Sequence, residues 1–268
     1  MRTARVEVSG VRVDAKHVLA RFDREIRQQP EAGARSVVER EPGIVRVVSA
    51  SDRWTGIAWC DLDGLDADAV VEAQVRRFAE TGRSWEWKHY SHDRPADLPG
   101  RLLAAGFEPG PVEALLIAEV DALPTEVVLP EGVRLVPVTG RAGTDLLVRV
   151  HDEVFGGDHA MIGRDLLERL AEQPDSIAAA VVMAGDRPIC AGRVEFHTGT
   201  GFASIWGGGT VADWRGRGVF RALVAHRAAL AKAAGFRYLQ VDASADSRPI
   251  LRRLGFEQLA MTTPFVHA

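Results

Sequence analysis

The chain has 268 residues, of which 46% are hydrophobic and 26% are charged. These proportions are those of an ordinary globular protein and exclude a largely disordered chain. The formal net charge of -4 at pH 7 argues against general nucleic-acid binding, which needs a broad basic surface.

The sequence gives no sign of export, membrane insertion or a metal site. Its first residues form no apolar signal core, and no segment approaches the roughly 18 consecutive apolar residues of a membrane helix. Cys60 and Cys190 lie far apart and match no metal-ligand spacing, so we expect two reduced structural thiols. We therefore expect a cytoplasmic protein with no membrane or nucleic-acid partner and no bound metal.

The first half of the chain predicts alternating helices and strands. We expect a helix over 69–80, a strand over 85–89, a helical segment over 99–107 and a strand over 112–120. Asp66 and Asp68 precede the first helix, where carboxylates cap free amides.

A linker rich in proline and glycine follows, because these residues interrupt periodic structure. It predicts one domain over 1–122, a linker over 123–130 and a second domain over 131–268. The elements expected in the second half are strands over 133–138, 176–185, 189–197, 202–211, 236–243 and 256–266, and helices over 141–155, 162–172, 219–234 and 246–254.

The two halves share a similar ending. The segment LLAAGF at 102–107 corresponds to LRRLGF at 251–256. A repeat spacing of roughly 150 residues indicates duplicated domains, since solenoid repeats recur every 20–50 residues or so. We expect two copies of one mixed α/β fold.

The most informative segment is 210–221, between an expected strand and an expected helix. Its glycines allow backbone amides to turn toward an anion, and a helix N-terminus adds free donors and a positive dipole end. Arg215, Arg217 and Arg221 add positive charge. A P-loop lysine and the third glycine of a dinucleotide-binding motif are both missing. A glycine-rich surface turn without a ligand is the alternative.

The hexapeptide RGRGVF at 215–220 resembles the Q/R-x-x-G-x-G/A motif of the GNAT acyltransferase superfamily. The strand 238–242 and the segment SRPILRRLGF at 247–256 resemble the next strand and short helix of that family. The resemblance covers 133–266 and implies a tandem two-domain α/β protein, with a mixed, mostly antiparallel central sheet flanked by helices in each domain.

The resemblance also implies acetyl-CoA as co-substrate. Thr210 and Val211 would bind the pantetheine arm, the amides from Gly216 onward would bind the pyrophosphate, and Ser244 would lie near the far wall. Phe220 stands where the family usually has Gly or Ala, and we expect it to pack against the sheet. The implied cofactor-binding residues are Thr210, Val211, Arg215, Gly216, Arg217, Gly218, Val219, Phe220, Arg221, Ser244 and Ser247.

The first copy looks degenerate. Where the second copy has glycines and arginines, it reads DLDGLDAD at 61–68, and four carboxylates would repel a pyrophosphate. We expect this copy to bind no CoA.

Two groups that the family often uses for proton transfer are missing. Ser204 occupies the strand position where several members carry a carboxylate, and Leu251 the position usual for tyrosine. Glu195 is the substitute candidate for the general base, with His197 on the same strand face. A surface Glu-His pair is the alternative interpretation.

Candidate acceptor contacts are Trp206, on the strand before the loop, and Asp152, within a polar cluster from His151 to His159. A core tryptophan and an ordinary charged surface are the alternatives. The sequence thus predicts an acyl-CoA-dependent N-acyltransferase that acts on a primary amine of a small molecule or peptide. A non-catalytic acyl-CoA sensor is the competing hypothesis, and an interaction role for the first copy, including a homodimer, stays open.

Overall fold

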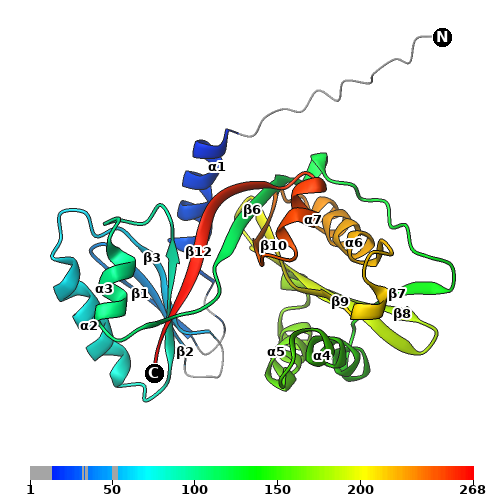
Figure 1. The fold of residues 1–268 in the computed structure, drawn as a ribbon, viewed down its shortest axis with the longest axis horizontal. Coiled ribbons are helices and arrows are strands. Elements are labelled where there is room, and N and C mark those ends of the chain that lie inside the picture. Colours follow the sequence, from blue (N-terminus) through cyan, green and yellow to red (C-terminus); the bar gives the residue numbers. More distant parts are fainter. Residues whose placement is uncertain (1–13, 32, 34–35, 50–53) are drawn as a thin grey trace, which may run out of the picture.

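The computed structural model describes residues 14–31, 33, 36–49 and 54–268. Figure 1 shows two lobes joined by strands that cross the middle of the molecule. The first half contains α1 (Ala15–Phe22), a π-helical turn (Asp23–Arg27), β1 (Ser36–Glu41), β2 (Ile44–Ser49), β3 (Gly56–Cys60), α2 (Ala67–Ala79), β4 (Trp85–Tyr90), α3 (Leu98–Ala104), β5 (Glu108–Pro109) and β6 (Glu113–Glu119).

The second half begins after a segment, 124–130, that contains no helix or strand. Its elements are β7 (Val133–Pro137), α4 (Arg141–Phe155), α5 (Ala160–Glu172), β8 (Ile177–Ala184), β9 (Arg187–Phe196), β10 (Phe202–Thr210), α6 (Val219–Ala233), β11 (Tyr238–Ala243), α7 (Arg248–Arg253) and β12 (Glu257–His267). The helices α6 and α7 lie on one face of the sheet, and α4 and α5 lie on the other (Figure 1).

One mixed sheet runs through both halves of the described chain, in the order β1-β2-β3-β4-β12-β6-β11-β10-β9-β8-β7, with β5 beside β12. The predicted fold class is confirmed, although the two expected sheets are joined into one.

The joint is an exchange of strands between the halves. The strand β6 pairs with β11 through six positions, from Tyr238↔Glu119 to Ala243↔Ala114. The last strand, β12, pairs with β6 on one side and with β4 on the other, where Thr262 faces Tyr90. Each half therefore completes the sheet of the other, and the predicted boundaries at 122 and 131 stay a prediction.

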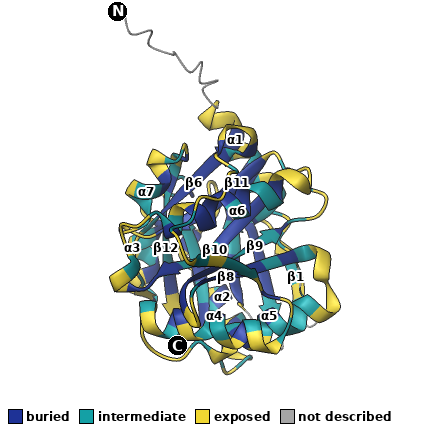
Figure 2. Ribbon diagram, turned by 90° about the vertical axis from the view of Figure 1, so that its right-hand side faces the viewer, coloured by how far each residue is buried: buried dark blue, intermediate teal, exposed yellow. Residues whose placement is uncertain are grey.

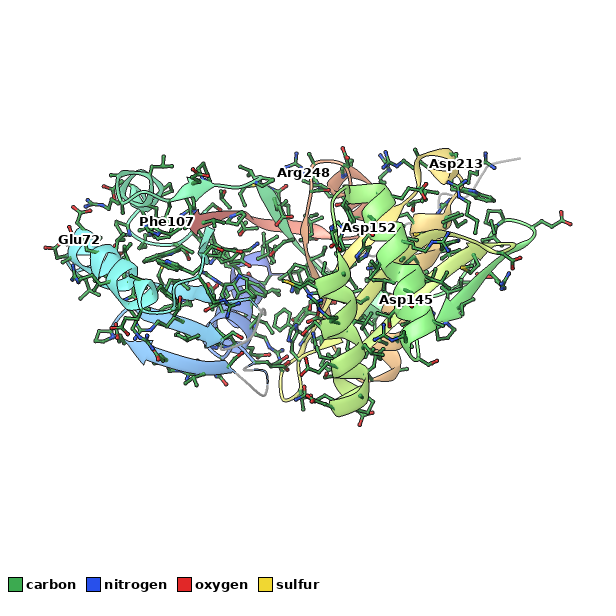
Figure 3. The ribbon with its side chains drawn as sticks, turned by 90° about the horizontal axis from the view of Figure 1, so that it is seen from below. Glu72, Phe107, Asp145, Asp152, Asp213 and Arg248 are labelled. Atoms are coloured by element: carbon green, nitrogen blue, oxygen red, sulfur yellow. The ribbon has the colours of Figure 1, made fainter. Side chains whose placement is uncertain are left out.

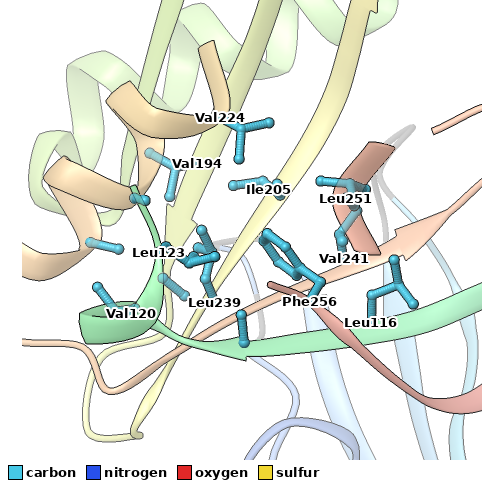
Figure 4. Packing of buried hydrophobic residues seen from close by; sticks show 14 of the residues in the cluster. Leu116, Val120, Leu123, Val194, Ile205, Val224, Leu239, Val241, Leu251 and Phe256 are labelled. Atoms are coloured by element: carbon cyan, nitrogen blue, oxygen red, sulfur yellow. The ribbon is translucent and has the colours of Figure 1, made fainter. Parts of the chain in front are cut away.

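The largest buried cluster draws on both halves. Leu116, Val120 and Leu123 pack with residues of α6, α7 and β11, among them Leu251 (Figure 4). Figure 2 shows the buried strands enclosed by helices whose outer faces are exposed. Each aliphatic side chain buried here stabilises the fold by about 1.5–3 kcal/mol, so the junction is part of the core.

Local expectations mostly agree with the structure. Asp66 is the N-cap of α2 and accepts a hydrogen bond from the Ala69 amide, whereas Asp68 pairs with Arg101 at 2.7 Å. Gly235 follows α6 with φ 82°, the left-handed conformation of a helix-ending glycine. No helix in the described part of the chain has the length and apolarity to span a bilayer.

Candidate functional site

The strands β10 and β11 separate shortly after they begin. They pair in parallel only from Phe202↔Tyr238 to Ser204↔Gln240, although β10 continues to Thr210 and β11 to Ala243. The edges of both strands beyond this point carry backbone donors and acceptors that no longer pair across the sheet. The resulting split can accept an extended molecule with amide groups of its own.

The split leads to the loop that the sequence singled out. Gly216 has φ 76°, and Gly218, the N-cap of α6, has φ 82°. Both need the left-handed region, which residues with a Cβ adopt at a cost of about 1–2 kcal/mol. A Cβ built on Gly216 has no heavy atom within 4 Å, so the space above the loop is open. The first amides of α6 have no intrahelical acceptor and are suited to bind an anion.

Arginines make the loop positive. Arg215 donates from Nε to the Thr210 carbonyl at 3.1 Å, and the Arg217 guanidinium lies 4.8 Å from the centre of the Trp214 ring. The acid in the loop, Asp213, is bound by Arg187 at 2.7 Å, and this pairing lowers its pKa. The local field therefore favours a phosphate.

Other predicted cofactor residues have buried side chains. Thr210 donates to the Cys190 sulfur at 3.1 Å, and Val211 and Val219 are 1% exposed. Phe220 packs against the main hydrophobic cluster, as expected. These residues can offer backbone groups to a ligand. Ser244 and Ser247 lie across the split, after β11, with their hydroxyls 3.2 Å apart.

A bulge in β10 lies beside a buried histidine. The pairing with β9 is interrupted between Trp206 and Gly209, and His151 donates from Nε2 to the Gly207 carbonyl at 2.8 Å. Burial lowers the pKa of His151 to about 4, so its ring is neutral at pH 7. A Cβ on Gly207, which has φ 59°, would lie 2.7 Å from this ring. The glycine is thus required for the contact that holds the bulge.

Glu195 lies between two arginines. Its carboxylate accepts from Arg193 at 2.8 Å and from Arg169 at 2.9 Å. Burial opposes ionisation, but the two guanidinium groups prevail and lower the pKa of Glu195 to about 2. The group is ionised, as a base must be, but it is a weak proton acceptor.

Ser204 connects two aromatic side chains. Its hydroxyl accepts a hydrogen bond from Trp206 Nε1 at 2.8 Å and lies 2.8 Å from His197 Nε2. His197 Nε2 can accept the hydroxyl proton in the tautomer that is protonated on Nδ1, the nitrogen that lies 3.8 Å from a Glu31 carboxylate oxygen. Burial lowers the pKa of His197, which favours its neutral form.

Asp152 lies away from this group, on α4. Its carboxylate accepts from the His159 amide and ring at 2.9 and 3.0 Å. It lines a shallow pocket of about 510 Å³ with Arg149, Glu153 and Arg187. Figure 3 shows Asp152 between Arg248 and Asp213 along one edge of the second half. Trp206 and Asp152, the two acceptor contacts expected from the sequence, thus lie on different elements, β10 and α4.

Three residues near the split were not found from the sequence. Tyr90 and Lys88 of β4 contact Asp242 of β11, at 3.4 Å and 3.2 Å. No local pattern predicts this contact, because it depends on the pairing of β4, β12, β6 and β11.

No protein-family model and no curated protein matched the chain by sequence. Among solved structures, the GCN5-related N-acetyltransferase from Kribbella flavida is 17% identical with a TM-score of 0.67, over 94% of this chain and 93% of that chain. The enzyme of the same description from Sphaerobacter thermophilus is 14% identical with a TM-score of 0.60, over 84% and 80%.

A tandem GNAT protein from the clavulanic acid biosynthesis pathway is 14% identical with a TM-score of 0.57, over 88% of this chain and 84% of that chain. These similarities extend over both halves of this chain. The chain therefore has the tandem fold of the GNAT acetyltransferases.

Proposed function

We propose that the protein is an acyl-CoA-dependent N-acyltransferase that uses acetyl-CoA and acylates a primary amine of a small molecule or peptide. The observation that carries this proposal is the split between β10 and β11, which leads to the Gly216–Gly218 loop at the N-terminus of α6. An acyl-CoA has an extended, amide-containing arm followed by a pyrophosphate. The split would accommodate the arm and the loop would accommodate the pyrophosphate.

The residues of the loop would bind the donor in two ways. The free amides from Gly216 to Arg221 would donate to the pyrophosphate, and the backbone of Thr210 and Val211 would pair with the pantetheine arm. Arg215 and Arg217 would add positive charge near the pyrophosphate. Ser244 and Ser247 would contact the donor from the opposite wall.

The β10 bulge would support the chemistry. In the reaction the amine nitrogen forms a bond to the thioester carbon, the carbon–sulfur bond breaks, the amine loses a proton and the thiolate gains one. A backbone amide at the bulge would stabilise the developing oxyanion, and the His151 contact with Gly207 would hold that backbone in place. Trp206 would form part of the wall for the acceptor.

Two groups compete for the role of base. Glu195 is the candidate from the sequence, but its two arginine partners favour a structural role, in which it holds Arg193 and Arg169. A relay from the amine through the Ser204 hydroxyl to the neutral His197 is the alternative, supported by the 2.8 Å contact between them. We favour the relay.

The weak basicity of Glu195 also keeps the non-catalytic sensor as the second candidate function. Both functions predict that acetyl-CoA binds to the full chain with one site. Calorimetric titration of acetyl-CoA tests this binding, and release of CoA thiol in the presence of an amine panel separates the two. Absence of binding would refute both, whereas binding without amine-dependent thiol release would leave the sensor.

A further inference from the structure

Three carboxylates and one ammonium group meet where the two halves join. We call this group the acidic junction: Glu86 and Lys88 of β4, Glu113 of β6 and Asp242 of β11. Lys88 Nζ lies 3.2 Å from Asp242 Oδ2 and 3.5 Å from Glu113 Oε2. One positive charge faces three acidic groups, so the junction has an excess of negative charge.

The protein compensates this excess only in part, since besides Lys88 the Tyr90 hydroxyl donates to Asp242 Oδ2 at 3.4 Å and Trp54 donates to Glu86. Burial, the largest effect, and the neighbouring Asp242 raise the pKa values of both Glu86 and Glu113, against the opposing effect of Lys88. The Asp242 side chain is 2% exposed, and its Oδ1 accepts no hydrogen bond from any described residue. A buried acceptor without a donor destabilises the fold, and a ligand that donates there would relieve this destabilisation.

A second acceptor lies beside it. Gln240 is 3% exposed, and its Oε1 likewise has no donor within the described ranges. Leu239 and Val241 pack against α6 and α7, so Gln240 and Asp242 face the opposite side of β11. Both unpaired atoms are oxygens, so a ligand that bound here would have to be a hydrogen-bond donor.

The acidic junction begins at the split. Ser204 pairs with Gln240, so Trp206 and Asp242 are each two residues further along strands that have by then separated. They face the same side of the sheet and border the split from its two edges. From Asp242 the junction extends onto β6 and β4 of the first half, and it reaches solvent through Glu113 and Lys88, which are 29% and 18% exposed.

We propose that the acidic junction binds a second, protonated nitrogen of the acceptor, so that the acceptor is an amine with at least two cationic groups. This inference rests on the proposed function. The reacting amine must be neutral to attack, whereas a surplus of carboxylates binds an ammonium or guanidinium group, so the two nitrogens occupy different sites. The first half thereby supplies Glu86 and Glu113 to the acceptor site.

An organic cation fits better than a metal ion. The position between Asp242 and Glu113 is already occupied by the Lys88 ammonium group. In addition, no group of His, Cys, Asp or Glu side chains in the described chain is arranged to hold a metal. A flexible ammonium group needs no fixed coordination sphere and can donate to carboxylates that already share one cation.

The test compares α,ω-diaminoalkanes with n-alkylamines of the same chain length, titrated calorimetrically into the full chain near neutral pH. We expect the diamines to bind wild-type protein about tenfold more tightly, as one charge-assisted hydrogen bond would allow. Asp242→Asn and Glu113→Gln should each remove most of this preference. Glu131→Gln, an exposed residue of the connecting segment, makes the same charge change and should leave it intact.

Acetyl-CoA is titrated into the same samples as an independent measurement. Normal acetyl-CoA binding with no diamine preference, or with a preference that both variants retain, overturns the acidic junction as a cation site. A diamine preference that depends on the junction in a protein that binds no acetyl-CoA upholds the cation site and refutes the transferase. Glu113→Gln guards against misfolding of the Asp242 variant, because Glu113 is partly exposed.

Discussion

The indole nitrogen of Trp206 donates to the hydroxyl of Ser204 at 2.8 Å. Since Ser204 is fully buried, this bond ties a half-buried tryptophan at the edge of the split to the interior of the sheet. The orientation of Trp206, which we propose as part of the acceptor wall, therefore depends on a hydroxyl beneath it.

Replacement of that hydroxyl should loosen the wall. We expect Ser204→Ala to lower the free energy of unfolding by about 1–2 kcal/mol, because Trp206 Nε1 loses its acceptor and His197 Nε2 its donor. The Michaelis constant for the amine should rise and turnover should fall, because the proposed relay loses its hydroxyl, whereas the acetyl-CoA affinity should not change. Denaturant unfolding and tryptophan fluorescence measure the first effect. Ser176→Ala, which removes one exposed bond to Gln173, is the control. An unchanged fluorescence spectrum would contradict this role.

The proposed phosphate cradle, which is the Gly216–Gly218 loop, can be tested with two glycines of equal conformation. Gly218 and Gly235 both have φ 82°, at opposite ends of α6. We expect Gly218→Val and Gly235→Val to destabilise the fold similarly, by about 1–2 kcal/mol. Only Gly218→Val should abolish acetyl-CoA binding, because its side chain enters the cradle. Calorimetric titration of acetyl-CoA into both variants measures this difference. Equal affinities of the two variants for acetyl-CoA would contradict a role of the loop in binding it.

Glu195→Gln separates anchoring from catalysis. Because the folded-state pKa of about 2 lies below the ordinary value, the ionised carboxylate stabilises the fold above pH 4.5 or so, and this contribution is lost as the pH falls toward 2. We expect the variant to lose about 3 kcal/mol at pH 7 and less at pH 3. Denaturant unfolding at about pH 7 and about pH 3 measures this loss of stability.

Turnover of the same variant tests whether Glu195 is the general base. If Glu195 holds Arg193 and Arg169, the rate at neutral pH should stay within about tenfold of wild type. A fall of about 100-fold or more would instead support the role of general base. Glu131→Gln is again the charge-matched control.

His151 should make stability depend on pH in a mildly acidic window. Its folded-state pKa of about 4 lies below the ordinary value near 6.5, so protonation favours unfolding. The stability is complete above pH 6.5 or so and is lost as the pH falls toward 4, by about 3 kcal/mol. We expect His151→Gln to flatten this dependence. His17→Gln, on the exposed face of α1, should leave the curve of the wild type.

The second half was largely predictable because its signals are local. The segment from Phe202 to Gly235 begins with aromatic and β-branched residues typical of a strand, turns at glycines and continues with helical periodicity, and each of these patterns involves neighbours in sequence. The hairpin of β8 and β9 was predicted for the same reason. The strands β1 to β3 and the π-helical turn at Asp23–Arg27 were not assigned from the sequence.

The candidate site was only half predictable. The glycine loop is a contiguous motif, but the partners of Glu195 come from two elements. Arg193 is two residues from Glu195, and period-two alternation predicts that both lie on the same strand face. Arg169 comes from α5, and no local pattern predicts its contact with Glu195. Asp242 and Glu113 meet only because β6 crosses into the other half. The register between strands that are far apart in the sequence cannot be read from local hydrophobic periodicity.

The strand exchange also limits how the molecule can move. A hinge that opened one lobe away from the other would have to break the six-position ladder between β6 and β11 and the pairing of β12 with β4. Such a motion costs far more than a loop rearrangement, since it exposes the common core. The two lobes thus behave as one stiff body, and a ligand that binds between them would not draw one lobe onto the other.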